Sequence, residues 1–509
     1  MSPVSVKSVA LAATALFASL GSAVQPLKVT GSNFVTSSSG DKFSMIGVDY
    51  QPGGSAGFDG KSDPLSDKDA CLRDAIILQR LGANVIRVYN LAPDINHDEC
   101  ASIFNAAGIY MLLDVNSGLY GTYMDRSKPW TTYTTDYLTH IFGVIEAFAP
   151  YPNTLGFFAG NEIINEDSDG KAPAYIRAVV RDMKEYIANN IARSVGVGYS
   201  AADVATMLTD TWNYLGCELE NSTNSKIDFF GLNDYEWCGD SSFTDSGYDK
   251  LVEMFEGTNI PVFFSEYGCN NIEPRTFTNV PVMYGPQMTV LSGGLVYEYS
   301  EEAENYGLVG INSTDEVTLL PDYVNLEKQF AKIDTASLTK VNKTAEAQAA
   351  SQCKPALITE SAFINNWDLP ERPKGGDDLV SKGISSKNPG SLVSVTATTM
   401  PATVHSPSSE ATGLSLVILE DTDSNLPGLY KNYKSNGKSQ PQPSYSPADK
   451  SGSGSSNSSS SDSDSDSSSS GSGSNSTSSG GQQSGASSMA SVSTGALSIA
   501  VFVVSLFFL

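Results

Sequence analysis

The sequence predicts an α/β protein built as a (β/α)8 barrel, and three observations lead to that fold. Short apolar, β-rich runs alternate with stretches whose apolar residues recur at helical spacing. There are eight such runs, which is the strand number of the barrel. The competing architecture, a doubly wound sheet, needs a Gly-rich phosphate loop after its first strand, and the "DYQPGGSAG" found there is not GxGxxG.

The expected strands share an apolar body and a polar end. In chain order they are residues 42–51, 84–90, 110–116, 153–162, 195–201, 228–237, 261–268 and 294–300. Helical patterns such as "DKDACLRDAIILQRLG" and "AYIRAVVRDMKEYIANNIA" lie between them. The catalytic domain is therefore expected over residues 24–335.

Both ends of the chain have the pattern of targeting signals. Residues 1–23 combine Lys7, an apolar run and small residues, which predicts a secretory signal peptide cleaved after Ala23. Residues 489–509 end in an apolar tail that is short for a membrane span and has no charged residue after it. Small residues and a polar spacer precede that tail, which predicts a GPI anchor on Gly485 or Ser484. We expect a lipid-anchored protein outside the cell.

Composition divides the region between barrel and anchor in two. Residues 336–450 have a weaker core pattern, and we expect a C-terminal extension and linker, tied back at least through Cys353. Residues 451–488 consist mainly of Ser with Gly and Asp. A tract of this kind cannot bury a core, so it is expected to be a disordered stalk.

Charge and histidine content exclude several classes of function. The formal net charge is −26, from 31 Lys+Arg against 57 Asp+Glu, so a nucleic-acid phosphate backbone would be repelled. The chain has 3 His, and none lies near a GxSxG or HExxH motif. A Ser-His-Asp triad or a His-rich zinc site is therefore not expected. The sequence predicts no metal and no cofactor. An excess of acidic residues over basic ones favours a neutral ligand over an anionic one.

The cysteines and sequons agree with export. The six cysteines are even in number, which outside the cytosol predicts three disulfides, although the sequence alone leaves their pairing open. Asn-X-Ser/Thr sequons lie at Asn221, Asn312, Asn342, Asn457 and Asn475, and the first three are the expected glycosylation sites.

Polar side chains gather where the expected strands end. These ends are Tyr50-Gln51, Tyr89-Asn90, Asp114, Asn161-Glu162, Asp234-Tyr235-Glu236, Glu266-Tyr267 and Tyr297-Glu298-Tyr299. A single Glu at a strand end is more often a solvated loop residue. Glu162 and Glu266, however, both follow buried runs, and barrel enzymes place their chemistry at this edge. Two carboxyl groups flanking one bond are what glycosidic cleavage needs.

The strand-end motifs also resemble a known family. "VIRVYN", "LLDV", "FFAGNE", "VGYSAAD", "FFGLNDYEWCG", "VFFSEYGCN" and "SGGLVYEYSEE" are similar to fungal glucanosyltransferases of glycoside hydrolase family 72. The resemblance runs from residue 27 to about residue 340. It implies an enzyme of the GPI-anchored, β-1,3-glucan-elongating type, placed at the outer face of the plasma membrane or in the cell wall. No cysteine follows Cys353, so the cysteine-rich carbohydrate-binding module of some members is absent.

The resemblance assigns roles to individual residues. It implies that Glu162 is the general acid/base and that Glu266 is the nucleophile. It implies glucan-binding positions at Gln51, Tyr89, Asp114, Asn161, Asp203, Tyr235 and Tyr297, with Asn161 on the sugar 2-hydroxyl and Asp203 on the acceptor side. It also implies the disulfides Cys71–Cys100, Cys217–Cys353 and Cys238–Cys269. Leu208 departs from the pattern, because many members carry an Arg there.

Three functions remain open at this stage. The leading one is a 1,3-β-glucanosyltransferase that retains anomeric configuration and acts as a monomer on donor and acceptor glucan chains. A retaining endo-β-glucanase would differ only in its preference for water as the acceptor. A non-catalytic glucan-binding protein of the wall would lack a strand-end carboxylate or amide, whereas Asn161, Glu162 and Glu266 are all present.

Overall fold

The computed structural model describes residues 24–439, apart from residues 314–315, 340–348, 408, 420–423, 433 and 436–437. All of them belong to one unit, which spans residues 1–446. The expected signal peptide, stalk and GPI signal, with Ser484 and Gly485, lie outside the described residues, as does the sequon at Asn342. Asn221 and Asn312 are exposed.

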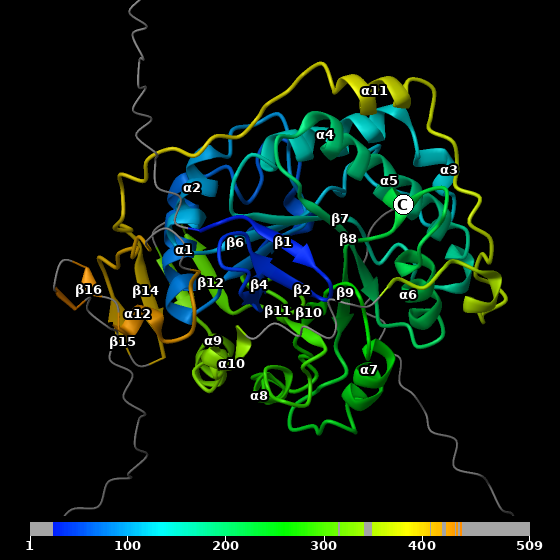
Figure 1. The fold of residues 1–509 in the computed structure, drawn as a ribbon. Coiled ribbons are helices and arrows are strands. Elements are labelled where there is room, and N and C mark those ends of the chain that lie inside the picture. The colour runs from blue at the N-terminus through cyan, green and yellow to red at the C-terminus, as the bar shows by residue number, and fades with distance from the viewer. Residues whose placement is uncertain are drawn as a thin grey trace, which may run out of the picture. The chain divides into compact units, whose positions relative to one another are not determined.

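Eight parallel strands close into a barrel, which confirms the predicted fold (Figure 1). Around the barrel the order is β10-β11-β4-β5-β6-β7-β8-β9. The strands are β4 (Met45–Asp49), β5 (Val85–Val88), β6 (Tyr110–Asp114), β7 (Thr154–Asn161), β8 (Gly196–Ala202), β9 (Phe229–Asp234), β10 (Val262–Tyr267) and β11 (Leu291–Val296). Each one overlaps the run predicted for it.

The last barrel strand differs most from its predicted bounds. It begins at Leu291 rather than at residue 294, in a segment whose two glycines hide the strand pattern. It ends at Val296 rather than at residue 300. Two bonds to barrel strands follow, from Tyr297 N to Tyr267 O and from Tyr299 N to Asp49 O. From Glu298 onward the backbone also bonds to the segment that follows it, as Glu298 N does to the carbonyl of Tyr306.

Helices connect successive strands and surround the barrel. They are α1 (Lys68–Leu81), α2 (Asp98–Ala106), α3 (Pro129–Thr132), α4 (Thr135–Phe148), α5 (Ala172–Asn190), α6 (Leu208–Gly216), α7 (Tyr248–Phe255), α8 (Val280–Met283) and α9 (Pro321–Phe330). Their ends follow local chemistry. The Asp67 carboxylate accepts from the first free backbone amides of α1, and Gly82, at φ 95°, ends that helix in the left-handed region. Because every connection is of this kind, all strand carboxyl ends lie on one face.

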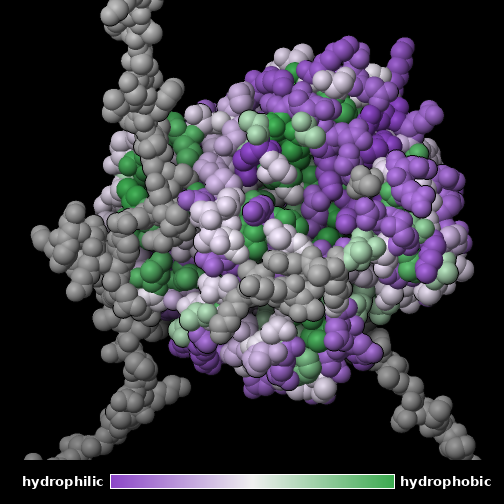
Figure 2. Space-filling view, viewed as in Figure 1, coloured by the Kyte–Doolittle hydropathy of each residue, from purple (hydrophilic) through white to green (hydrophobic). Residues whose placement is uncertain are grey.

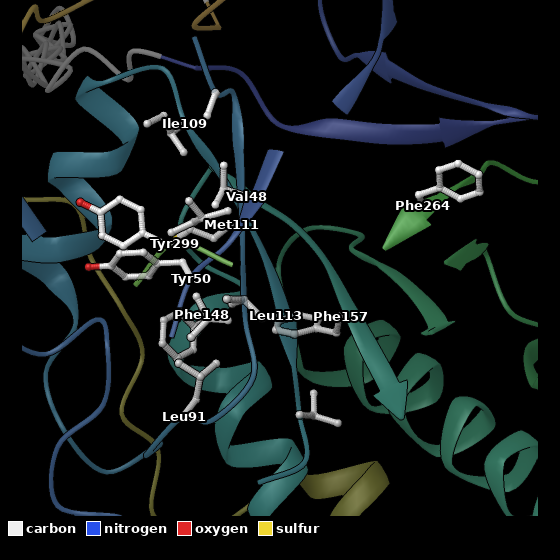
Figure 3. Close-up of a cluster of buried hydrophobic side chains, with 14 of the residues drawn as sticks. Val48, Tyr50, Leu91, Ile109, Met111, Leu113, Phe148, Phe157, Phe264 and Tyr299 are labelled. Atoms are coloured by element: carbon white, nitrogen blue, oxygen red, sulfur yellow. The ribbon is translucent and has the colours of Figure 1, made fainter. Parts of the chain in front are cut away.

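The core at the barrel has two parts, one outside the barrel strands and one inside them. Outside, apolar side chains of the strands pack against those of the helices, as Val48 and Met111 do near Phe148 of α4 in Figure 3. The hydroxyls of Tyr50 and Tyr299 point the same way there and both donate to Asp74 of α1, at 2.8 and 2.7 Å.

Inside the barrel, alternate strand residues form an apolar plug. It includes Met45, Val85, Tyr110, Leu112, Phe158, Phe229, Phe263 and Leu295. The N-terminal hairpin, β1 (Leu27–Thr30) and β2 (Asn33–Thr36) with β3 (Lys42–Phe43), adds Leu27, Phe34 and Phe43 to the same cluster. This end of the barrel is therefore filled with side chains, and the polar residues are left to the carboxyl end.

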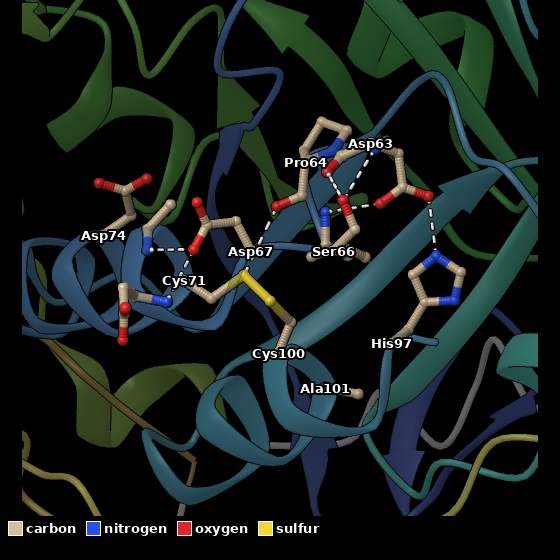
Figure 4. Close-up of a disulfide and its surroundings, with 12 residues drawn as sticks. Asp63, Pro64, Ser66, Asp67, Cys71, Asp74, His97, Cys100 and Ala101 are labelled. Carbon is tan, nitrogen blue, oxygen red and sulfur yellow. Dashed lines mark hydrogen bonds and ion pairs between the residues drawn. A yellow bond between two sulfur atoms is a disulfide. The ribbon is translucent and has the colours of Figure 1, made fainter. Parts of the chain in front are cut away.

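The structure contains the three disulfides that the resemblance implied. Cys71–Cys100 joins α1 to α2, as Figure 4 shows, next to the Asp67 cap. Cys238–Cys269 joins the segments that follow β9 and β10. Cys217–Cys353 ties the C-terminal extension to the end of α6.

The extension is more extensively packed than the linker that the sequence predicted. It contains α10 (Thr335–Leu338), α11 (Gly376–Lys382), β14 (Thr403–Ser406), β15 (Ser409–Ala411), α12 (Leu429–Asn432), β16 (Lys434–Ser435) and β17 (Lys438–Ser439). β14 and β15 join β12 (Val309–Ser313) and β13 (Glu316–Leu319) in a four-stranded sheet. In Figure 1 the extension is the yellow segment that passes α11 and reaches β14 beside α1.

Side chains of the barrel helices hold this extension, which explains why its own pattern is weak. The Gln79 amide bonds to both N and O of Val417, at 3.0 and 2.7 Å. Asp210 accepts from the amides of Thr359 and Glu360. Isolated apolar residues such as Phe363 complete the contact. The backbone is thus satisfied without long regular elements, and these contacts leave no periodic signal in the sequence.

The surface drawn in Figure 2 is mainly polar, with apolar residues in small separate areas. Among the described residues, no helix is both long and apolar enough to cross a bilayer.

Candidate active site

A polar layer lies above the apolar plug, at the carboxyl ends of the barrel strands. Continuing the inward-facing positions of each strand leads from Met45 to Asp49 on β4, from Val85 to Arg87 on β5, and from Leu112 to Asp114 on β6. The site is therefore the point where the interior pattern changes from apolar to polar.

Glu266 lies in this layer, with 7% of its surface exposed. Its Oε1 accepts from Arg87 Nη1 at 3.1 Å and from the Tyr89 hydroxyl at 2.9 Å. Its Oε2 accepts from the Tyr235 hydroxyl at 2.8 Å. The register of β10 against β9 shifts between Phe264 and Glu266, and such an irregularity re-aims a side chain. Three donors therefore hold both oxygens of this carboxylate.

Arg87 is the cation of the site, and sequence reasoning missed it. The side chain is fully buried, and Nε and Nη2 donate to Asp114 at 2.9 and 3.3 Å. Asp114, predicted as a substrate-binding residue, is thus placed as the partner that holds Arg87. Burial raises the pKa of Asp114, and the Arg87 charge opposes that rise. A basic residue at an inward position of a buried strand was the available signal.

Glu162 follows β7 with φ 48°, a left-handed conformation that is uncommon for a residue with a side chain. Its backbone N donates to Ser200 O at 2.9 Å, which ties this turn to β8. Its Oε1 accepts from the Asn233 amide at 2.8 Å. Such strain is typical of functional sites whose surroundings determine the backbone.

Asn233, also missed in the sequence, bonds to Glu162 from the strand that pairs with the strand of Glu266. It is the Cα register partner of Glu266 across β9 and β10. Its Oδ1 accepts from the hydroxyls of Ser200 and Ser265 at 3.0 and 2.8 Å, so its amide nitrogen must face Glu162. The same nitrogen lies 3.1 Å from Asn161 Oδ1. The structure therefore brings Asn161 and Glu162 together at one amide, on the strand that pairs with the strand of Glu266.

The two carboxyl groups also interact electrostatically. The pKa of Glu266 is raised to about 7, because burial and the charge of Glu162 raise it by more than Arg87 and the hydroxyls of Tyr235 and Tyr89 lower it. The ionisation of Glu266 is therefore sensitive to the state of Glu162 and to each of its donors.

Four tyrosine rings lie together beside Glu266. The ring of Tyr297 is 6.3 Å from that of Tyr89 and 6.5 Å from that of Tyr235, in edge-on arrangements. Tyr306 joins them, 5.3 Å from Tyr297 and 5.8 Å from Tyr235. Tyr306 was missed because it belongs to the hairpin after the last strand. Tyr89, Tyr235 and Tyr297 are partly exposed, so they offer an aromatic wall to a ligand.

Gln51 and Asp203, two further predicted binding residues, have their main interactions with groups other than Glu162 and Glu266. Gln51 is buried, and its Oε1 accepts from the backbone amides of Tyr89 and Asn90, at 3.2 and 3.3 Å, so it fixes the end of β5. Asp203 is half-buried after β8. Burial and the charge of Glu236 raise the pKa of Asp203 to about 6. Leu208, the departure from the family pattern, is buried at the start of α6.

Within the described part of the chain, no cluster of three or more His, Cys, Asp or Glu side chains is arranged to hold a metal ion. The chemistry available from the residues on this face is that of two carboxyl groups, one buried guanidinium, amides and phenols.

Comparison with known proteins agrees with this geometry. The glucanosyltransferase profile, glycoside hydrolase family 72, matches residues 16–334. The 1,3-beta-glucanosyltransferase gel2 of Aspergillus fumigatus is 53% identical over 422 residues, 82% of this chain and 88% of that protein. The probable 1,3-beta-glucanosyltransferase GAS3 of Saccharomyces cerevisiae is 47% identical over 410 residues, 76% of this chain and 78% of that protein.

A solved structure shows the same relation. A mutant of Saccharomyces cerevisiae Gas2p, in complex with laminaritetraose and laminaripentaose, has a TM-score of 0.61 and 38% identity. The match covers 69% of this chain and 75% of that one. By its strand-end carboxyl pair, its matched residues and these relatives, the chain belongs to glycoside hydrolase family 72, the glucanosyltransferases.

Proposed function

We propose that the protein is a 1,3-β-glucanosyltransferase. It cleaves a β-1,3-glucan and transfers the new reducing end to the non-reducing end of a second glucan, with retention, in the assembly of the cell wall. The observation that carries this proposal is the site in which Glu266 is held by three donors while Glu162 bonds to the neighbouring Asn233, in a chain of the glucanosyltransferase family.

In the first step Glu266 attacks the anomeric carbon. A bond forms between a carboxylate oxygen and C1, the glycosidic C1–O bond breaks, and Glu162 gives its proton to the departing oxygen. The donors on Glu266 orient it for attack and lower its pKa, in opposition to its burial. The left-handed backbone at Glu162 and the Asn233 amide orient the acid.

In the second step Glu162, now a carboxylate, removes a proton from the acceptor hydroxyl. The acceptor oxygen bonds to C1, the bond to Glu266 breaks, and the two inversions together give retention. With water as the acceptor the result is hydrolysis. With the 3-hydroxyl of a glucan end the chain lengthens. The tyrosine cluster favours the sugar, because pyranose rings pack on aromatic faces and displace water.

The resemblance to the family supports the following binding roles. Tyr89, Tyr235 and Tyr297 contact the sugar beside the nucleophile, and Asn161 receives its 2-hydroxyl. Asp203 acts on the acceptor side. Gln51 and Asp114 are further binding positions, and they also hold the backbone of Tyr89 and the guanidinium of Arg87.

Product length tests the activity directly. The enzyme is incubated with one laminarin oligomer whose reducing end has been reduced, and the products are separated by size. Transfer yields oligomers longer than the substrate. Products that are all shorter would indicate the endo-β-glucanase instead, and an unchanged oligomer would indicate a glucan-binding protein without activity.

We further propose that the protein is a secreted monomer, GPI-anchored at Gly485 or Ser484 to the outer face of the plasma membrane or the cell wall, with glycans on Asn221, Asn312 and Asn342. The support is the end composition together with the exposure of Asn221 and Asn312. Phosphatidylinositol-specific phospholipase C should release it from intact membranes. Protein that stays bound, in a sample where another GPI protein is released, would contradict the anchor.

A further inference from the structure

Asp49 is a carboxyl group of the polar layer that the mechanism does not use. Asp49 ends β4 and is fully buried. Among the described residues, neither of its carboxyl oxygens has a hydrogen-bond partner. Most buried polar groups are paired, so this exception needs an explanation. An ionised carboxylate in such a place would be strongly destabilising, whereas a protonated one is far less costly.

The position of Asp49 relates it to the nucleophile. Its Cα register partner on β5 is Arg87, and neighbouring strands lie about 4.8 Å apart. Both residues continue the inward-facing positions of their strands. Arg87 is the same guanidinium that donates to Asp114 and Glu266. Asp49 is therefore beside the cation on which the carboxylate of Glu266 depends.

Acidic groups outnumber basic ones around Asp49. Arg87 faces it from β5, Asp114 from β6 and Glu266 from β10, while Glu298 faces it from the segment after β11. The phenols of Tyr89, Tyr235, Tyr267 and Tyr297 also lie within its field. One guanidinium cannot balance four carboxylates, and Asp114 and Glu266 already hold its N–H groups. Burial, and the charges of Glu266, Asp114 and Glu298, raise the pKa of Asp49 well above its ordinary value against the opposing effect of Arg87.

We propose that Asp49 is a positioning residue for the nucleophile: it carries a proton through the working range, so that Arg87 stays on Asp114 and Glu266, and its ionisation at alkaline pH draws Arg87 away and stops glycosylation. The proposal rests on the proposed function, because Glu266 must be the nucleophile for this switch to matter. The rate of glycosylation of Glu266 would then fall at alkaline pH for a reason that does not involve Glu162.

Formation of the glycosyl-enzyme isolates this effect. In a Glu162→Ala background, a β-laminarioligosyl fluoride donates its sugar without needing a proton, so the adduct mass can be followed against pH. The adduct rate should rise as Glu266 ionises and then fall at alkaline pH, up to tenfold per pH unit. Adding Asp49→Asn should abolish the alkaline fall. Asp49→Ser, which also cannot ionise, is the alternative if the Asn variant does not fold.

Glu298→Gln is the matched control, since it removes another buried carboxyl that interacts with Glu266. Burial and the charge of Glu302 raise the pKa of Glu298 to about 9, so it is the competing origin of an alkaline fall. The fall should survive Glu298→Gln. A fall that disappears in Glu298→Gln but persists in Asp49→Asn overturns the proposal, and so does a profile of Glu162→Ala with no alkaline fall.

Stability gives a readout that needs no activity. A carboxyl whose pKa is raised by folding loses its proton first in the unfolded chain, so it destabilises the fold increasingly as pH rises above its unfolded value. The unfolding constant of the unsubstituted protein, relative to Asp49→Asn, should grow by up to tenfold per pH unit from about pH 4. A ratio independent of pH overturns the proposal. If Glu162→Ala forms no adduct at any pH while this ratio does grow, the proposed function fails, and not the protonation of Asp49.

Discussion

The two glutamates that we propose to be catalytic lie in contrasting surroundings. Glu266 is nearly buried and receives a guanidinium and two phenols, all of which stabilise its charged form. Glu162 is half-exposed and bonds to a neutral amide, which imposes direction without a full charge. The difference teaches that position at the barrel mouth makes both residues candidates, but their partners assign the roles. A nucleophile needs its charge kept, whereas an acid/base must gain and lose a proton in each cycle.

The largest effect is expected on the Glu266 side. Glu266→Gln keeps the shape and the donors but removes the attacking charge, so transfer should fall by at least about 10³-fold and no covalent adduct should form. Product analysis on laminarin oligomers, with mass spectrometry of the protein, measures both. Turnover that is retained in this variant would refute the assignment of the nucleophile.

A smaller loss is expected at the acid/base. Glu162→Ala should lower the rate of transfer from a glucan donor by about 10²- to 10⁴-fold, because the departing oxygen then lacks its proton donor. The loss should largely disappear in the first step when the donor is a β-laminarioligosyl fluoride. Glu266→Gln is the matched control and should not be rescued in this way. Equal losses for Glu162→Ala with both donors would show that Glu162 does not protonate the leaving group.

A smaller effect is expected at Asn233, which bonds to Glu162. Asn233→Ala removes the amide that orients Glu162 and leaves the hydroxyls of Ser200 and Ser265 to rearrange. Transfer should fall by about 10- to 100-fold, the usual range for a supporting residue. The fluoride donor should recover most of this loss, because it does not need an oriented acid. A loss of the same size with the fluoride would place the role of Asn233 at Glu266 instead.

The smallest effect concerns one donor of Glu266. The Tyr235 hydroxyl lowers the pKa of Glu266, so Tyr235→Phe should raise that pKa, and the acid limb of kcat/KM should move to higher pH. The shift should be at most about one pH unit, because a single hydrogen bond contributes about 1 kcal/mol. Tyr306→Phe, on the neighbouring ring, should leave the acid limb where it is. A shift toward lower pH for Tyr235→Phe would contradict the direction of this bond.

Much of the fold could be predicted because its signals are local. Apolar β-rich runs alternate with helical spacing, and strand carboxyl ends share one face in a barrel, so Glu162 and Glu266 could be placed at one mouth. The extension beyond Cys353 could not be predicted in the same way. Its backbone is satisfied by Gln79 and Asp210, residues far away in the chain, and such contacts leave no periodicity where they are received.

The sequence by itself determined the barrel, its polar mouth and the identity of the two glutamates, because each depends on neighbours along the chain. Only the tertiary structure decided which partners surround them. Arg87, Asn233 and Tyr306 come from different strands and loops, and Asp114 was shown to hold Arg87. The physical reason is that hydrogen bonds and charge interactions in the barrel interior act across strands, between residues whose sequence separation carries no pattern.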